Sequence, residues 1–269
     1  MLSPSEIDEL STFAQRLADA AAKVTLPHFR SGLSVDNKRG EFVFDPVTAA
    51  DRDAEQAIRA LIKSHYPDHG IYGEEHGKEE GTSPLTWVID PIDGTRSFIS
   101  GVPLWGTLIA LNDGSKPIIG LMDQPYIGER FLGRPGGSEL ISRHEHRILK
   151  TSGCTKLEDA LLGNTDPAMF RDEAAKAAFR EISGKVRLRR FGGDCYFYCL
   201  LAAGTLDLVI ESSLQPYDVQ ALIPVIEHAG GIMTSWTGGD PQMGGSVVAA
   251  ATPELHAAAL EILSKVPSA

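Results

Sequence analysis

The chain has 269 residues, of which 42% are hydrophobic and 23% charged, and these proportions are ordinary for a globular enzyme and exclude a disordered chain. Its formal net charge of −11 argues against a nucleic-acid backbone as a general partner. Three cysteines without framework spacing favour a reducing compartment, and no stretch approaches the roughly 20 apolar residues that span a bilayer. With no signal-peptide pattern at the N-terminus, we expect a soluble, cytoplasmic protein that has no membrane partner.

The N-terminal half is predicted to begin with two helices. Ser3, Pro4 and Glu6 form a capping-box pattern, and apolar residues then recur at helical spacing up to residue 24. A second helix should start near Thr48, which places Asp51 in its first turn. Strands are then expected over residues 70–72, 86–90, 106–112, 117–123 and 129–133, and an Asp-Gly turn joins the third and fourth as a hairpin.

Helices and short strands alternate in the C-terminal half, which is typical of a layered α/β lobe. We expect helices near 171–182, 194–203, 216–229 and 253–265, and strands near 187–191, 206–211, 232–236 and 246–250. Cys195 and Cys199 lie four residues apart in an apolar stretch, which predicts buried packing. The polar stretch 136–151 is the weakest seam, so we predict two lobes, 1–142 and 143–269, that share one active-site cleft.

The densest chemical signal runs from residue 87 to residue 95. A strand should deliver Asp90 to its C-terminal end, and Pro91 stiffens a turn that brings Asp93 back toward it. Two carboxylates on one turn repel each other unless a cation such as Mg²⁺ lies between them. Gly94 and Thr95 follow at the start of a short helix, where backbone N–H groups favour phosphate. The alternative is an ordinary Asp-Gly turn with a solvated carboxylate.

Two further acidic sites strengthen the metal interpretation. Glu74 and Glu75 follow a short strand, and Asp218 lies in the first turn of a predicted helix. Taken alone, these residues would indicate an exposed acidic turn and a helix-dipole carboxylate. Their coincidence with Asp90 and Asp93 favours one acidic cluster.

Four separated motifs resemble, in order, those of the inositol-monophosphatase-like family. They span residues 45–51, 73–75, 87–100 and 216–231, so the resemblance covers nearly the whole chain. The resemblance implies an α/β fold, an αβαβα sandwich of the sugar-phosphatase type. It also implies a Mg²⁺-dependent phosphomonoesterase that acts on a small-molecule phosphate ester and forms a homodimer.

The resemblance also implies the metal ligands. Glu74, Asp90 and the carbonyl of Ile92 would hold one Mg²⁺. Asp90, Asp93 and Asp218 would hold a second, and a third, weaker ion would bind near Glu74. Clustered metals of this kind activate water and offset the charge of a leaving alkoxide.

Catalytic roles follow from the same resemblance. Thr95, oriented by Asp51, would act with Glu74 and the first metal to deprotonate the attacking water. The backbone of Gly94 and Thr95 would hold the phosphate.

The substrate prediction depends on the C-terminal lobe. Several segments are similar to the histidinol-phosphate phosphatase branch of the family, which implies substrate contacts from Gly193, Asp194 and Glu211. Two carboxylates suit a substrate that carries an ammonium and an imidazole group, so L-histidinol phosphate is our first prediction. Asp194 could also be the N-cap of the following helix.

Alternatives remain open at this stage. Inositol 1-phosphate or a broad range of sugar phosphates is the second substrate prediction, and a non-catalytic metal-binding relative is the alternative from another class. Arg187, Arg189 and Arg190 could bind a second phosphate, although alternating arginines on a strand are more often a solvated face or an interface.

Overall fold

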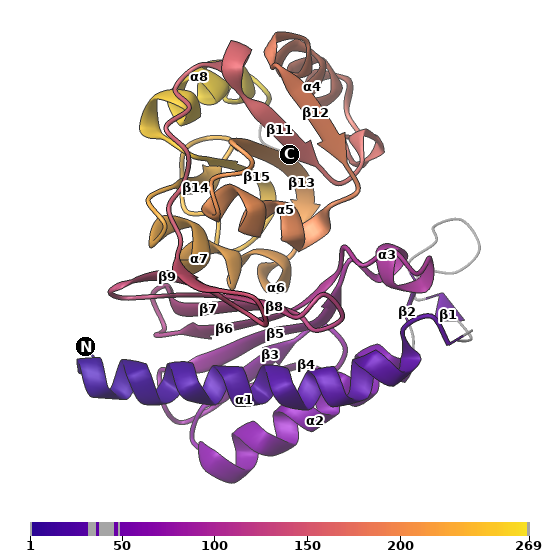
Figure 1. Cartoon of the computed structure of the whole chain (residues 1–269), viewed down its shortest axis with the longest axis vertical. Helices are drawn as coiled ribbons and strands as arrows, with labels where there is room; N and C mark the ends of the chain where they lie inside the picture. The colour runs from indigo at the N-terminus through magenta and orange to yellow at the C-terminus, as the bar shows by residue number, and fades with distance from the viewer. Residues whose placement is uncertain (1, 32–35, 38–45, 48, 268–269) are drawn as a thin grey trace.

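The structure is a computed structural model that describes residues 2–31, 36–37, 46–47 and 49–267. Asp45 and Thr48, which opened one of the sequence motifs, lie outside the described residues. The chain forms five layers, in the order helices, sheet, helices, sheet, helices (Figure 1). The predicted αβαβα sandwich is therefore confirmed.

Two helices form the first outer layer, α1 (Pro4–His28) and α2 (Ala49–His65). The capping box at the start of α1 is present, since the Ser3 hydroxyl oxygen accepts from the Glu6 N–H and the Glu6 side chain accepts from the Ser3 N–H. One apolar face of each helix packs on the sheet, with Phe13 against the ring of Trp87 at a centroid distance of 5.6 Å.

The first sheet has the strand order β10-β9-β8-β7-β6-β5-β3-β4, and β3 and β5 are its parallel pair. Neighbouring residues of β5 point to opposite faces, with Trp87 and Ile89 toward α1 and α2 and Val88 toward the middle helices. Its strands are β3 (Gly70–Gly73), β4 (Gly77–Glu79), β5 (Thr86–Asp93), β6 (Gly106–Asn112), β7 (Pro117–Gln124), β8 (Glu129–Arg134), β9 (Gly137–Ser142) and β10 (His146–Ile148). Three short elements lie beside it, namely β1 (Asp36–Asn37), β2 (Pro46–Val47) and α3 (Thr95–Ile99).

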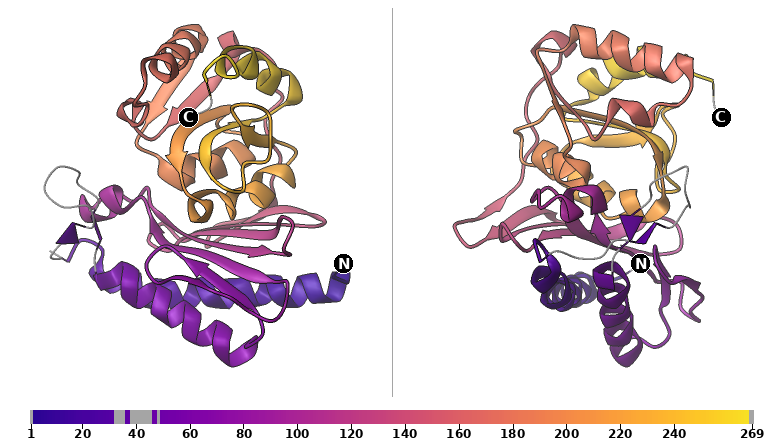
Figure 2. Two further views of the ribbon diagram at one scale, coloured as in Figure 1. Left: turned by 180° about the vertical axis from the view of Figure 1, so that it is seen from behind. Right: turned by 90° about the vertical axis from the view of Figure 1, so that its right-hand side faces the viewer.

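The middle layer consists of α5 (Asp194–Ala202), α6 (Pro216–Val219) and α7 (Leu222–Glu227). These helices belong to one apolar core with residues of both sheets (Figure 2). Two glycines of the first sheet allow these helices to approach it closely. A Cβ at Gly120 would lie 1.9 Å from the carbonyl oxygen of Ala221, and one at Gly133 would lie 2.3 Å from the backbone of Pro224. The middle helices therefore pack directly against the first sheet.

The second sheet has the order β12-β11-β13-β15-β14 and is mixed. Its far face is covered by α4 (Glu173–Lys185) and α8 (Pro253–Leu263), which form the last layer. Its strands are β11 (Leu161–Asn164), β12 (Leu188–Phe191), β13 (Leu208–Leu214), β14 (Ile232–Ser235) and β15 (Gly245–Ala250), and two 3-10 turns precede α4, η1 (Leu157–Asp159) and η2 (Pro167–Met169).

Most predicted elements are present, including both N-terminal helices and the hairpin of β6 and β7. The helix expected over 216–229 is instead two helices, α6 and α7, and residues 220 and 221 separate them. The stretch 136–151, which we interpreted as a polar seam, contains β9 and β10, so the first sheet continues to Ile148. A lobe boundary at residue 142 therefore stays a prediction. Among the described residues, no helix is long and apolar enough to cross a membrane.

Candidate active site and metal centre

The candidate site begins where β5 ends. The register of β5 against β6 shifts between Asp90 and Asp93. Pro91 lies within this irregularity, and its carbonyl accepts a hydrogen bond of 2.8 Å from the buried hydroxyl of Thr107. The N–H of Ile92 donates to Oδ1 of Asp90 at 3.0 Å. The turn therefore brings Asp93 back beside Asp90, as the sequence indicated.

Three carboxylates meet at this turn. Asp90, Asp93 and Asp218 each place an oxygen within 4.8 Å of the other two. Asp218 comes from α6, where it accepts a hydrogen bond of 2.7 Å from the N–H of Gln215. Burial, and after it the charge of Glu74, raises the pKa of Asp90 well above its usual range. Ionised carboxylates this close together repel one another, so a bound cation would stabilise their charged forms.

Glu74 reaches the same cluster from β3. Because β3 and β5 are parallel neighbours, both strands end at the same edge of the sheet. The N–H of Glu74 donates to the carbonyl of Ile89 at 3.2 Å, and its side chain hydrogen-bonds with Asp90. The structure thus gathers Asp90, Asp93 and Asp218 into one cluster and places the Glu74 side chain against Asp90.

These residues fit Mg²⁺ by the chemistry of their donor atoms. Mg²⁺ prefers oxygen ligands and is commonly held by one or two carboxylates with several waters. The cluster offers carboxylate oxygens and, at Ile92, a backbone carbonyl that already accepts a hydrogen bond of 3.1 Å from Thr95 Oγ1. A carbonyl oxygen has two lone pairs, so this hydrogen bond leaves one for a cation.

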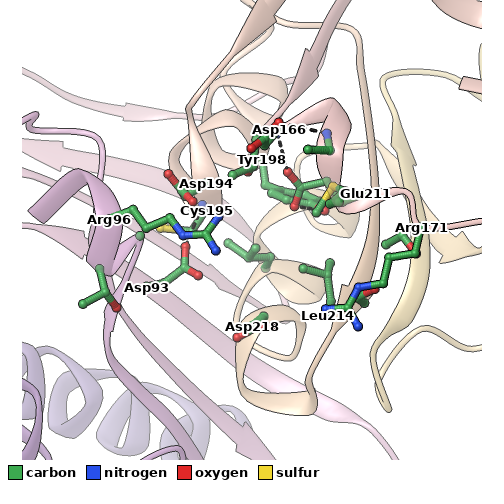
Figure 3. A pocket seen from close by; sticks show the side chains of 18 residues that line it. Asp93, Arg96, Asp166, Arg171, Asp194, Cys195, Tyr198, Glu211, Leu214 and Asp218 are labelled. Atoms are coloured by element: carbon green, nitrogen blue, oxygen red, sulfur yellow. Dashed lines mark hydrogen bonds between the residues drawn. The ribbon is translucent and has the colours of Figure 1, made fainter. Parts of the chain in front are cut away.

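A cavity of about 440 Å³ opens beside the cluster and is lined by both lobes (Figure 3). Six of the predicted site residues line it, namely Asp93, Gly94, Thr95, Asp194, Glu211 and Asp218. The other five do not line it, namely Asp51, Glu74, Asp90, Ile92 and Gly193.

Asp194 forms part of the wall opposite the metal cluster. It is the first residue of α5 and has a left-handed φ of 43°, and no side chain of the described residues caps this helix. Gly193 is the N-cap, so the capping interpretation of Asp194 is wrong. The Asp194 carboxylate instead accepts a hydrogen bond of 3.2 Å from Ser97 Oγ, across the lobes. A Cβ on Gly94 would lie only 3.2 Å from Asp194 Cγ, so the absence of a side chain at Gly94 leaves room for the Asp194 carboxylate.

Glu211 lies deeper in the same wall, on β13, and is only 3% exposed. Its carboxylate accepts hydrogen bonds from the N–H of Thr165 at 2.8 Å and from the hydroxyl of Tyr198 at 3.2 Å. Burial nevertheless raises the pKa of Glu211 to about 7. Burial, followed by the charge of Asp93, likewise raises the pKa of Asp194 well above its usual range.

Two arginines face each other across the cavity. Arg96 comes from α3 and Arg171 from the segment before α4, and the side chains of Asp93 and Asp194 lie beside Arg96 (Figure 3). Five acidic side chains outnumber these two basic ones in the lining, namely Asp93, Asp166, Asp194, Glu211 and Asp218. The cavity therefore suits metal cations together with a positively charged ligand group.

The structure locates each predicted catalytic residue but, among the residues it describes, gives no hydrogen bond between Asp51 and Thr95. Asp51 lies in the first turn of α2, as predicted, and it is buried. Orientation of Thr95 by Asp51 stays a prediction. Packing explains why residue 193 is a glycine, because an added Cβ would lie 2.2 Å from the ring of Phe197. The contact of Gly193 with substrate also stays a prediction.

Cys195 and Cys199 are buried, as predicted, and burial raises the pKa of both thiols well above their usual range. Cys195 also has a role that we did not foresee, since its N–H donates to Oδ2 of Asp93 at 2.8 Å. The start of α5 is thereby tied to the metal cluster.

Sequence reasoning missed several residues of the lining. Asp166 and Pro167 form a capping pattern, confirmed by a hydrogen bond of 2.9 Å from the N–H of Ala168 to the Asp166 carboxylate. That pattern could have been found. Arg171 and Tyr198 carried no local signal, because packing of distant segments brings them to the cavity.

Arg187, Arg189 and Arg190 are exposed on or just before the edge strand β12. They do not line the cavity. This placement favours the solvated-face or interface interpretation over a second phosphate site.

Comparisons with known proteins agree with this geometry. The sequence profile of the inositol monophosphatase family matches residues 6–268. The chain is 43% identical to the bifunctional phosphatase IMPL2, chloroplastic, of Arabidopsis thaliana, over 97% of this chain and 77% of that protein. It is 34% identical to the histidinol-phosphatase of Streptomyces coelicolor, over 94% and 96% of the two chains. The solved structure of an inositol monophosphatase from Zymomonas mobilis matches with a TM-score of 0.84 and 39% identity, over 97% and 99%.

The chain therefore belongs to the inositol monophosphatase family, and it is a metal-dependent phosphomonoesterase.

Proposed function

We propose that this phosphomonoesterase hydrolyses L-histidinol phosphate to L-histidinol and phosphate, a step of histidine biosynthesis. The observation that carries the proposal is the pair of carboxylates Asp194 and Glu211, which line the cavity opposite the metal cluster. A neutral polyol gives a buried carboxylate no charge to balance, whereas histidinol brings an ammonium and an imidazole group.

The phosphate end of the substrate is assigned to the turn after β5. The backbone of Gly94 and Thr95 would hold the phosphate oxygens at the start of α3. The left-handed φ of 82° at Gly94 favours glycine, and the missing side chain leaves room for the ester.

The metal ligands are proposed to be Glu74, Asp90, the carbonyl of Ile92, Asp93 and Asp218, which would hold two Mg²⁺ ions, with a third bound more weakly near Glu74. When bound, Mg²⁺ supplies a lowered pKa for a water molecule and positive charge beside the ester oxygens.

Proton transfer is assigned to the chain's own side chains. Glu74 lies at the cluster and would accept the proton of the attacking water, with Thr95 and Asp51 as its predicted partners. Water attacks phosphorus as the ester oxygen leaves, and that oxygen takes up a proton from a second water molecule to become the hydroxyl of histidinol.

Relatives support the substrate class. A protein described as a histidinol-phosphatase is 34% identical to the chain, and the 43% identical relative is described as a bifunctional phosphatase. Inositol 1-phosphate is the second candidate substrate, because the 39% identical solved structure is of an inositol monophosphatase.

The test is phosphate release with Mg²⁺ from L-histidinol phosphate and from inositol 1-phosphate, measured side by side. We expect kcat/KM for histidinol phosphate to be at least about tenfold higher, since one charged hydrogen bond contributes this much. Preparations of Asp93→Asn give the background of contaminating phosphatases. A clear preference for inositol phosphate would overturn the proposal.

Two further predictions concern the whole protein. The homodimer implied by the family resemblance is checked by sedimentation. Cytoplasmic location is also kept as a prediction, although the Arabidopsis relative is described as chloroplastic.

A further inference from the structure

Glu55 is a fully buried carboxylate on α2 that has no part in the proposed chemistry. It accepts hydrogen bonds from the N–H of Glu75 at 2.7 Å and from the N–H of His76 at 3.2 Å. It also forms an ion pair with Arg59, whose Nε lies 2.7 Å from Oε1 of Glu55. A buried acidic side chain with three donors is a built site, and its two backbone donors belong to the turn between β3 and β4.

That turn is closed around the Glu55 carboxylate. A Cβ on Gly73 would lie 2.0 Å from Oε1 of Glu55, so glycine is required where the strand passes the carboxylate. The guanidinium of Arg59 donates in turn to the carbonyl of Gly77, at the other end of the turn. Glu55 and Arg59 therefore hold both ends of the segment 73–77.

Glu74 lies inside this segment. Its own N–H is bonded to Ile89 in β5, and the next two N–H groups along the chain are bonded to Glu55. The backbone on both sides of Glu74 is thus fixed, and its side chain is directed to Asp90.

We propose that Glu55 is a positioning residue that fixes Glu74 beside Asp90 and so preorganises the first metal site. The inference rests on the proposed function in one respect, namely that Glu74 is a metal ligand. Partners that orient the ligands of a metal typically change its affinity 10- to 100-fold when they are removed.

A carboxylate is the group that this position requires. Its two oxygens accept from three donors, whereas a glutamine would present an NH₂ group to at least one N–H. Glu55→Gln should therefore loosen the turn while keeping the size of the side chain. Gly73→Ala provides a second route, because the added methyl group displaces the carboxylate without removing its charge.

The experiment measures binding of Mn²⁺ alone, by electron paramagnetic resonance, with no substrate present. We expect Kd for the tightest Mn²⁺ to rise about 10- to 100-fold in Glu55→Gln and in Gly73→Ala. The matched control is Glu181→Gln, which removes an acid of the same type from α4, outside this turn, where Glu181 pairs with the exposed Lys185. We expect Kd of the control to stay within about twofold, as is usual for a surface pair.

A second readout separates positioning from a purely structural role. If Glu55 only stabilised the fold, Glu55→Gln would melt at a lower temperature while the folded protein kept the wild-type Kd, and that result would overturn the proposal. If both variants fail to fold, amide hydrogen exchange of the metal-free wild type decides. Protected N–H groups at Glu75 and His76 support the proposal, and rapid exchange there contradicts it.

The outcomes also distinguish this inference from the proposed function. Failure of the wild type to hydrolyse histidinol phosphate would remove the substrate proposal and leave the Mn²⁺ result intact. An unchanged Kd in the two variants would remove only the role of Glu55.

Discussion

The two walls of the cavity hold their carboxylates in different ways. On one wall, the metal wall, Asp93 and Asp218 lie within 4.8 Å of each other and of Asp90, which is not in the lining. On the other wall, the recognition wall, Asp194 and Glu211 are not part of that cluster. In the proposed function the metal wall holds cations, whereas each carboxylate of the recognition wall meets one charged group of the substrate.

The largest effect is expected when the concentrated charge is reduced. Asp93→Asn should lower kcat about 10³-fold on every phosphate ester, because it removes one predicted metal ligand and its charge. Burial raises the pKa of Asp93, so its ionised form opposes folding at neutral pH, and the metal-free variant should melt at a higher temperature than wild type. Phosphate release and calorimetry in EDTA check both statements. A loss confined to one substrate would contradict the division between the walls.

On the recognition wall the effect should be selective. Asp194→Asn keeps the shape and tolerates the left-handed backbone, so it tests the charge alone. We expect KM for histidinol phosphate to rise about 10- to 100-fold with kcat little changed, and activity on inositol 1-phosphate to persist. Ser97→Ala is the control, since it removes a donor to Asp194 and leaves the carboxylate. An unchanged KM would exclude Asp194 from recognition.

Glu211 should make recognition depend on pH. Its pKa of about 7 means that the carboxylate is neutral below pH 7 and charged above it. KM for histidinol phosphate should therefore fall as pH rises through 7, and Glu211→Gln should lose this step. A profile that is the same in variant and wild type would assign the step to another group.

The charge on Glu211, which should favour substrate binding, should lower the free energy of unfolding. Because burial raises the pKa of Glu211 from 4.5 to about 7, the folded state is penalised progressively as pH rises from 4.5 to 7. Metal-free Glu211→Gln should thus be more stable than wild type at pH 8, by up to about 3 kcal/mol, and lose this advantage near pH 4. Urea unfolding at the two pH values is the measurement.

The smallest effect is expected outside both walls. Arg189→Gln removes an exposed cation from β12, away from the cavity lining, so kcat and KM for histidinol phosphate should stay within about twofold. The ratio of activities on fructose 1,6-bisphosphate and histidinol phosphate should also be unchanged. A selective loss on the bisphosphate would restore the second-phosphate interpretation.

The residues of the metal cluster could be predicted from the sequence because each stands in a short motif of neighbouring residues. Asp90 and Asp93 lie on one turn that proline and glycine mark, and Glu74 and Asp218 stand in motifs that follow short strands or open helices. The family resemblance then joined these segments. Local chemistry of this kind is present in the residue order itself.

The rest depended on packing that no local pattern reports. Asp194 was interpreted as a helix cap from its position before an apolar stretch, whereas its hydrogen bond with Ser97 of α3 joins residues 97 positions apart in the chain. Glu55 carried no local signal, because its backbone partners Glu75 and His76 lie about 20 residues further along the chain. The strands β4, β9, β10 and β11 were among those missed, because they are short or rich in polar residues or glycine.

The close contact of Gly120 and Gly133 with the segment that carries α6 and α7 has a consequence for the history of the protein. Since one apolar core contains residues of both sheets, neither half is expected to fold when expressed without the other. Unfolding should then be a single cooperative transition. A lineage that acquires a new substrate could not exchange one half for that of a relative, and it would have to change single residues of the recognition wall in place.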